Sequence, residues 1–377
     1  MALRLARAGR GVALVDGASF PRGKVCGEGV LPLGVAALDE LGVLAELEPQ
    51  GQRFQGVRYH LPDGSRAAGR FPGGASGLGI AREVLDAALV DAARGEANVD
   101  LRLGAWVQGF TRDASGVEVR LGDALLRAPL IVGADGGRSA VRRAAGLEAR
   151  APKRERFGVG VHVDHPPRDD GELPHVEVVL GPGCELYLTP LKATRTGVAV
   201  LLERAGLERI QGDLDGGVRG LLRASGGPAA ALADAPFAGK ARALGPLALG
   251  ARAAHAERVA LVGDAAGALD PISGEGIALG LVTAAELAEE LEGCFAANDF
   301  SARRLAGWTR RRTRALRAPR LLTATLLHLA RRPKRARRAV RALARTPAAF
   351  DRLLGLAAGA PPSARTVRDG LRVALGV

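Results

Sequence analysis

The sequence predicts an α/β fold: a Rossmann-like dinucleotide-binding domain with an inserted β-sheet substrate domain and a C-terminal helical tail. Three observations predict this fold class. The chain opens with a short helical segment and the buried strand "GVALVD", which ends in Asp16. Two later buried segments, "LIVGAD" and "RVALVGD", also end in an acid. Strand-like segments with alternating hydrophobicity lie between those two, as expected for a sheet inserted into an α/β frame.

The opening segment has the pattern of the second half of a dinucleotide-binding βαβ unit. In such a unit the acid at the end of the second strand accepts hydrogen bonds from a ribose. Asp16 fits that role, although an Asp before a Gly is also a common turn residue. The first strand and its G-x-G-x-x-G turn do not precede the helix. We expect Met1 to lie inside the first helix because the start codon is assigned too late. The alternative is a true truncation.

The second motif is "APLIVGADGGRSAVRR" (residues 128–143). A buried strand leads to Asp135, two glycines allow a sharp turn, and Ser139 begins a helix. Backbone N–H groups and a helix start beside a carboxylate suit a polyhydroxylated or phosphorylated ligand. An ordinary strand-to-helix turn gives the same pattern.

The third motif is "ERVALVGDAAGALDPISGEGIALGL" (residues 257–281). Its strand ends at Asp264, whose carboxylate suits a sugar-alcohol hydroxyl. A helix then begins around Gly274 to Ile277, where backbone amides and the helix dipole favour an electron-rich ring edge. Two such strand ends more than a hundred residues apart argue against coincidence.

These two motifs resemble the DG and GD motifs of FAD-dependent oxidoreductases with the p-hydroxybenzoate hydroxylase fold. "FPRGKVCGEGV" resembles a loop of the geranylgeranyl reductase-like branch, and "GLGIAREVLDAAL" resembles its Arg-x-x-Leu helix. The resemblance covers nearly the whole chain. It implies FAD as cofactor and NAD(P)H as reductant.

The resemblance also implies which residues contact FAD. Asp16 would bind the adenosine ribose, Asp264 a ribityl hydroxyl, and the segment that begins at Pro271 the isoalloxazine. The full implied set is Asp16, Arg22, Lys24, Arg82, Asp135, Gly136, Asp264, Pro271, Gly274, Glu275, Gly276 and Ile277. Cys26 and Glu28 are polar side chains expected near the ring and are the candidate catalytic residues. Cys26 suits a redox or proton-donating role, and a small buried packing role fits it equally well. No catalytic residue is assigned.

The expected domain boundaries follow from these motifs. The FAD-binding domain is discontinuous, comprises residues 1–52, 76–150 and 246–295, and lacks its N-terminal part. A β-rich substrate domain comprises residues 53–75 and 151–245. Residues 296–377 form a basic helical C-terminal region.

Charge and cysteine content limit the class of protein. The net charge is +13, but the cations gather between residues 303 and 346, and no zinc spacing, RNP-like cluster or helix-turn-helix accompanies them. Nucleic-acid and metal binding are therefore not expected. Three separated cysteines favour a reducing, cytoplasmic location. The basic tail also has the apolar and cationic alternation of interfacial helices, which allows peripheral membrane contact. A tail packed on the protein with its charges solvated is the alternative.

The sequence thus predicts an FAD-dependent oxidoreductase that acts on a hydrophobic small molecule or lipid. The reaction is either NAD(P)H- and O2-dependent hydroxylation or reduction of a double bond. The Trp-x-Trp-x-x-Pro signature of halogenases is missing, since Trp106 and Trp308 stand alone. A truncated, flavin-free binding protein or inactive remnant is the alternative from another class.

Overall fold

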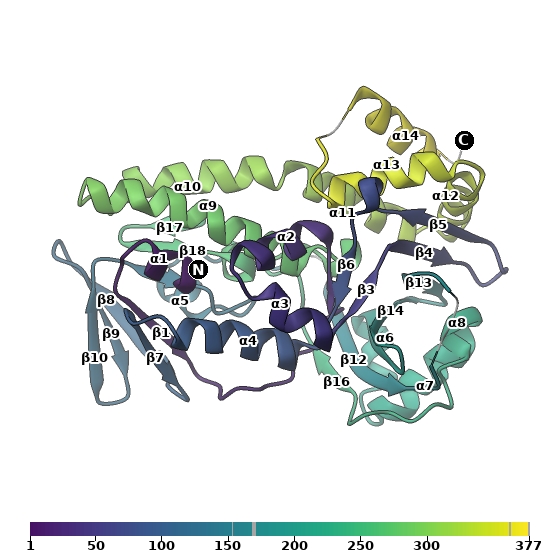
Figure 1. Ribbon diagram of the computed structural model, residues 1–377, viewed down its shortest axis with the longest axis horizontal. Coiled ribbons are helices and arrows are strands. Elements are labelled where there is room, and N and C mark those ends of the chain that lie inside the picture. The colour runs from purple at the N-terminus through teal and green to yellow at the C-terminus, as the bar shows by residue number, and fades with distance from the viewer. Residues whose placement is uncertain (153, 168–170, 362, 376–377) are drawn as a thin grey trace.

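The computed structural model describes residues 1–152, 154–167, 171–361 and 363–375. The molecule is elongated, with a nucleotide-binding region at one end, a large sheet at the other, and four C-terminal helices beside that sheet (Figure 1). The mixture of parallel and antiparallel sheets with helices confirms the predicted α/β class.

Short parallel strands form the centre of the nucleotide-binding region. Strand β1 (Val12–Asp16) pairs with β7 (Val99–Leu103), and β11 (Ile131–Gly133) pairs with β18 (Val259–Leu261). All of β18 is buried, which explains its continuous hydrophobic run. The remaining strands here are antiparallel: β17 (His255–Ala256), β8 (Gly109–Arg112), β9 (Val117–Leu121) and β10 (Ala124–Ala128).

Two long helices pack on this region, α9 (Gly276–Ala296) and α10 (Ala302–Ala315). Leu305 and Trp308 of α10 belong to the same core as β18, and the Trp308 indole donates a 2.9 Å hydrogen bond to the Leu261 carbonyl. Helix α10 therefore packs with the nucleotide-binding region. The shorter helices here are α1 (Ala2–Arg7), α2 (Pro32–Glu40), α3 (Leu44–Leu47), η1 (Glu48–Gln50), α4 (Arg82–Arg94), α5 (Ala140–Ala144), η3 (Gly263–Ala266) and η4 (Pro271–Ser273).

The large sheet has seven strands in the order β16-β12-β15-β14-β13-β4-β5. Only the β13–β4 pair is parallel, and it joins two segments that are far apart in sequence. Its strands are β4 (Gly56–His60), β5 (Arg66–Arg70), β12 (Arg156–Asp164), β13 (His175–Gly181), β14 (Cys184–Lys192), β15 (Arg195–Glu203) and β16 (Arg242–Leu244). A small sheet adjoins it, made of β2 (Gly29–Val30), β6 (Gly77–Gly79) and β3 (Gln52–Phe54).

Helices cover the large sheet at two places. Val218 and Leu222 share a core with Val159 and Val200 of the sheet; the helices there are α6 (Arg204–Glu208), α7 (Leu214–Ser225) and α8 (Gly227–Ala230). The C-terminal helices pack near β5, where Ala67 belongs to their core. They are α11 (Arg317–Ala330), α12 (Pro333–Arg345), α13 (Pro347–Ala357) and α14 (Ala364–Leu375). The short helix η2 (Pro72–Gly74), which follows β5, contacts α13.

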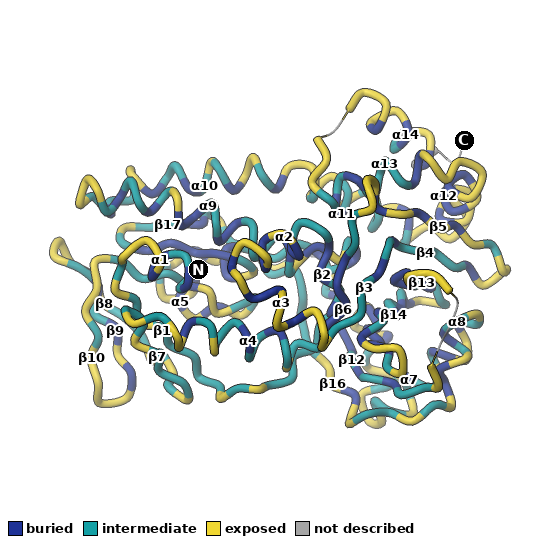
Figure 2. Tube along the Cα trace, viewed as in Figure 1, coloured by how far each residue is buried: buried dark blue, intermediate teal, exposed yellow. Residues whose placement is uncertain are grey.

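Dark buried segments run through both ends of the molecule and through the contact between them (Figure 2). Across the described ranges, we find no helix with the length and hydrophobicity that a membrane span requires.

Candidate cofactor site

Three acidic residues stand where the short parallel strands end. Asp16 is the last residue of β1, while Asp135 and Asp264 follow β11 and β18, which pair in parallel with Gly133 opposite Leu261. Parallel strands end at the same edge of a sheet, so Asp135 and Asp264 lie at one edge. Asp264 is exposed, and no hydrogen bond to its carboxylate occurs within the described part of the chain.

Asp135 holds the start of α5. One of its carboxylate oxygens accepts hydrogen bonds from the amides of Ala140 at 2.6 Å and Val141 at 3.1 Å. The buried Ser139 hydroxyl caps the same helix by accepting from the Arg142 amide at 2.9 Å. One oxygen of Asp135 is therefore used by the protein, which leaves the other for a ligand.

Arg142 joins the two acidic loops. It is almost fully buried, and its guanidinium donates to the carbonyls of Ala265 at 3.0 Å, Asp264 at 3.3 Å and Gly137. Burial lowers its pKa. Sequence reasoning named Arg142 only as part of the helix start after Asp135 and gave it no role at the site. Its only signal was its position in the helix that follows Asp135.

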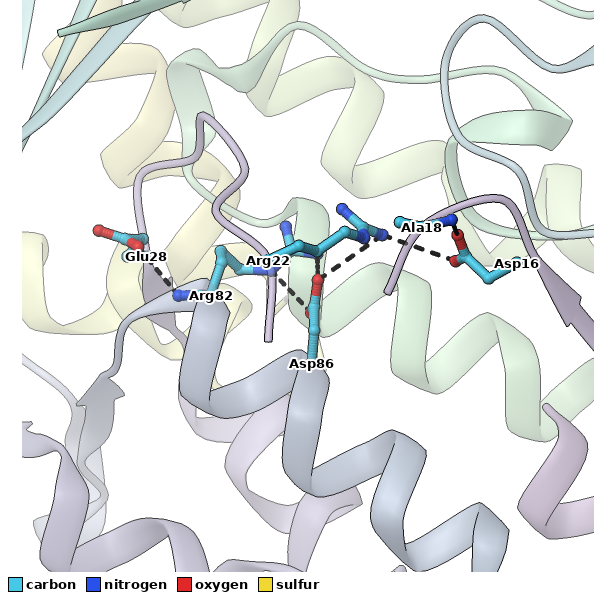
Figure 3. A network of polar contacts seen from close by, with 6 residues as sticks. All are labelled: Asp16, Ala18, Arg22, Glu28, Arg82 and Asp86. Atoms are coloured by element: carbon cyan, nitrogen blue, oxygen red, sulfur yellow. Dashed lines mark hydrogen bonds and ion pairs between the residues drawn. The ribbon is translucent and has the colours of Figure 1, made fainter. Parts of the chain in front are cut away.

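A chain of ion pairs connects Asp16 to helix α4 (Figure 3). The Arg22 guanidinium lies 3.8 Å from a carboxylate oxygen of Asp16 and 3.9 Å from one of Asp86. Arg82 makes two hydrogen bonds to Asp86, at 2.9 Å and 2.7 Å. Asp86 was not predicted, although its i,i+4 spacing from Arg82 on a predicted helix was a usable signal.

Three cations, Arg22, Lys24 and Arg82, lie close enough to interact. Burial lowers the pKa of Lys24, repulsion by Arg82 and Arg22 lowers it further, and Asp264 opposes these effects. Burial acts to lower the pKa of Arg82, but contacts with Cys26 and Asp86 raise it overall. The buried Nε of Arg22 has no hydrogen-bond partner among the described residues. A cluster of three cations that includes an N–H donor without a partner fits an anionic diphosphate.

The segment from η4 to α9 presents a helix start. Gly274 has a positive φ of 70°, a conformation that favours glycine, and Glu275 precedes the first residue of the 21-residue helix α9. Glu275 is buried, and one of its carboxylate oxygens has no partner in the described chain. Burial raises its pKa, against a hydrogen bond from Ser273. Gly276 and Ile277 form the first turn, whose amides are free for a ligand.

Glu28 connects the loop after β1 to helix α4 and to the large sheet. It is buried with a positive φ of 57°. One carboxylate oxygen accepts from the Arg82 amide at 2.9 Å, and the other lies 2.7 Å from Nε2 of His162 on β12. Gly197 makes room for this contact, since a Cβ there would lie 2.9 Å from the Glu28 carboxylate.

The pair with Glu28 changes the protonation of His162. The hydrogen bond of His162 to the Glu28 carboxylate raises the pKa of the imidazole, while burial and the charge of Arg195 oppose the rise. Cys26 is half-buried and accepts a 3.4 Å hydrogen bond at its sulfur from the Glu28 amide. The structure thus places Glu28 beside a histidine that sequence reasoning missed, and Cys26 beside Glu28. The one available signal was a polar residue within the strand "FGVGVHVD".

Residues 1–317 match the family described as "FAD binding domain". The chain belongs to this family. It is 31% identical over 323 residues to a menaquinone reductase of Mycolicibacterium smegmatis, a stretch that covers 78% of this chain and 74% of that protein. The match to the family and its relatives identifies this flavoprotein as an FAD-dependent oxidoreductase, as the sequence motifs predicted.

Solved structures share its fold. A flavoprotein/dehydrogenase of Cytophaga hutchinsonii superposes with a TM-score of 0.81 at 19% identity, covering 95% of this chain and 89% of that chain. The probable FAD-dependent monooxygenase PqsL of Pseudomonas aeruginosa superposes with a TM-score of 0.73 at 22% identity, covering 87% of this chain and 91% of that chain. These likenesses establish the p-hydroxybenzoate hydroxylase-type fold.

Proposed function

We propose that this flavoprotein is an NAD(P)H-dependent reductase that saturates a carbon–carbon double bond of a hydrophobic, isoprenoid-type lipid such as a menaquinone. The observation that carries the proposal is the His162–Glu28 pair between the FAD-binding region and the large sheet. Similarity to a menaquinone reductase over most of both chains supports the choice of substrate class.

The residues of the site fit FAD in position and charge. Asp16 would accept hydrogen bonds from the adenosine ribose, as the acid at a second strand end does in nucleotide-binding folds. Arg22, Lys24 and Arg82 would neutralise the diphosphate. The free carboxylate of Asp264 would bind a ribityl hydroxyl, and Pro271 with the first turn of α9 would lie along the ring. When bound, FAD supplies hydride chemistry, with NAD(P)H as the source of electrons.

Saturation of a double bond adds a hydride to one carbon and a proton to the other. When His162 is protonated, its Nε2–H donates to Glu28 and Nδ1 carries the second proton. No hydrogen bond to Nδ1 occurs among the described residues. Glu28 is itself fixed by the Arg82 amide, so the pair holds a proton at a set position.

The test uses the FAD-loaded protein with NADPH or NADH and menaquinone in detergent micelles, with and without oxygen. We expect a product that gains two hydrogens, by mass spectrometry, in both atmospheres. Reduction of the quinone head group to a quinol would also add two hydrogens, but chemical oxidation removes these. The gain of two hydrogens at a carbon–carbon double bond should therefore persist after chemical oxidation. A product that gains an oxygen atom, and only in air, would show that the reaction is hydroxylation.

A further inference from the structure

The positive charge of the chain is concentrated on its C-terminal helices. Residues 301–350 contain 16 Lys and Arg and no Asp or Glu, whereas the whole chain has a net charge of +13. This segment comprises α10, α11, α12 and most of the first turn of α13. The rest of the chain is close to neutral, so the molecule carries a strong positive field on one part of its surface.

Helix α12 separates its apolar and cationic residues onto two faces. Ala339, Val340 and Leu343 are buried in the core shared with β5 and α13. Every Lys and Arg of the helix is exposed. Arg337 and Arg341 lie 3.2 Å and 2.9 Å from the Asp63 carboxylate, which fixes the helix to the sheet end.

Three cations of α12 have neither an ion pair nor a side-chain hydrogen bond in the described chain, whereas Arg335 hydrogen-bonds to His328. Lys334, Arg338 and Arg345 are separated by four and seven residues, a spacing that places them on one side of a helix. They lie away from the buried face, so their charges are available to a partner.

Exposed aliphatic side chains accompany these charges. Leu321 on α11 is 71% exposed and directly follows Arg320 in the helix. Val367 on α14 is 56% exposed in the sequence "TVR", and α14 packs against α12. The large hydrophobic side chains exposed on these helices are aliphatic, with no aromatic among them in the described residues. Aliphatic residues among cations suit a lipid surface, whereas single-stranded nucleic acid favours exposed aromatics.

The basic helices also contact the segment expected to hold the flavin ring. The Thr323 hydroxyl of α11 lies 3.3 Å from the Ser273 hydroxyl at the end of η4. Arg312 of α10 donates a 2.7 Å hydrogen bond to the Gly267 carbonyl after η3. Contact made by α11 with a partner would therefore take place beside the cofactor site (Figure 1).

We infer that α11, α12 and α14 form a surface that binds anionic lipid bilayers. Lys334, Arg338 and Arg345 attract the head groups, and Leu321 enters the acyl boundary. The cations and the aliphatic side chain act together, because the cations attract the helices to the bilayer and the aliphatic side chain holds them there. The inference goes beyond the proposed reaction and stands whatever the substrate is.

The experiment is co-sedimentation of the FAD-supplemented full chain with vesicles in about 0.1 M salt, where charges act over about 10 Å. One set of vesicles is phosphatidylcholine, and in the other a third of the lipid is phosphatidylglycerol. We expect binding to the anionic set alone. The triple variant Lys334→Gln, Arg338→Gln and Arg345→Gln should lower the partition coefficient on the order of a hundredfold.

A matched triple variant controls for net charge. Arg94, Arg127 and Lys240 are exposed cations of other regions, and replacing each with Gln removes the same total charge. This variant should bind anionic vesicles like the original chain. Leu321→Ser should reduce binding while the salt dependence stays the same. Equal losses in both triple variants would overturn the inference, because they would show a non-specific charge effect.

A separate binding experiment tests nucleic acid, which is another polyanion that attracts basic helices. Fluorescence anisotropy with a short DNA duplex and a short RNA should show weak binding that both triple variants reduce equally. Tight binding to either one, abolished by the α12 variant while vesicle binding is absent, would overturn the inference.

Discussion

At the scale of single residues, the protonation of His162 depends on Glu28. The imidazole is half-buried, and burial alone would lower its pKa, yet its hydrogen bond to the Glu28 carboxylate raises the pKa. The pKa of His162 is higher in the folded protein than in the unfolded chain. The pair therefore stabilises the fold fully at pH values below the pKa that His162 has in the unfolded chain. That contribution is lost as pH rises through the folded pKa. The proposed proton donor should lose activity over the same range.

Glu28→Gln should lower the pKa of His162, because it removes the negative charge beside the imidazole but keeps an acceptor for the Arg82 amide. NMR titration of the His162 ring protons measures this change. His165, which is bonded to Thr196 instead of Glu28, is the internal reference. In the lipid assay, the high-pH decline of activity should move to lower pH in the same variant. An unchanged His162 titration would contradict the role given to Glu28.

Asp264→Ala should weaken FAD binding by about 1–3 kcal/mol, because a flavin hydroxyl then loses its acceptor. Fluorescence titration with FAD measures the affinity. Asp234→Ala is the control, since Asp234 is exposed and pairs with Arg223 in the substrate region. Equal affinities in the two variants would show that Asp264 does not contact the cofactor.

At the scale of elements, a buried ion cluster connects the large sheet to η4. Arg156 of β12 pairs with Glu185 of β14 and lies 3.5 Å from Asp270, which caps η4. Burial raises the pKa of both acids, although Arg156 opposes the rise. The Tyr187 hydroxyl of β14 adds a 2.8 Å hydrogen bond to the Ile272 carbonyl. The segment from η4 to α9 is thus positioned by the large sheet.

Arg156→Met should lower the free energy of unfolding by about 3–5 kcal/mol at neutral pH, because two buried carboxyls lose their counter-charge. The loss should shrink as pH falls, since protonation neutralises the same carboxyls. Urea unfolding at pH values near neutrality and near 5 measures both effects. Arg204→Met, which removes an exposed pair with Glu155, should change stability little. A loss that grows at acid pH would contradict this account.

At the scale of the whole molecule, the candidate FAD contacts come from segments spread along the chain. They include the loop after β1, the start of α4 and the loops after β11 and β18. A ligand that contacts all of these segments stabilises the folded state by mass action, by about 2.7 kcal/mol at a hundredfold excess over its dissociation constant.

FAD should therefore raise the melting temperature of the full chain more than riboflavin does at equal concentration, since riboflavin lacks the diphosphate and adenosine. Differential scanning fluorimetry at increasing ligand concentration measures the two shifts. Lys24→Gln should reduce the FAD shift and leave the riboflavin shift unchanged. A chain that stays colourless and shows no shift with FAD would favour the flavin-free binding protein instead.

The sequence by itself determined the fold class, the family and the cofactor. These follow from patterns in consecutive residues: a buried strand, its terminal acid and the turn after it, at Asp16, Asp135 and Asp264. The ion pair of Arg82 and Asp86 also depends only on local sequence, since the two residues are four apart on one helix. Which of these residues touch FAD stays a prediction.

Only the tertiary structure decided the long-range contacts of the site. Glu28 and His162 are 134 residues apart, and Arg142 reaches a carbonyl 122 residues away. Such pairs depend on strand order, on the room left at Gly197 and on which groups are desolvated together. None of these is encoded in local periodicity, because a hydrogen-bond partner across two domains is set by how the sheets pack and not by spacing along the chain.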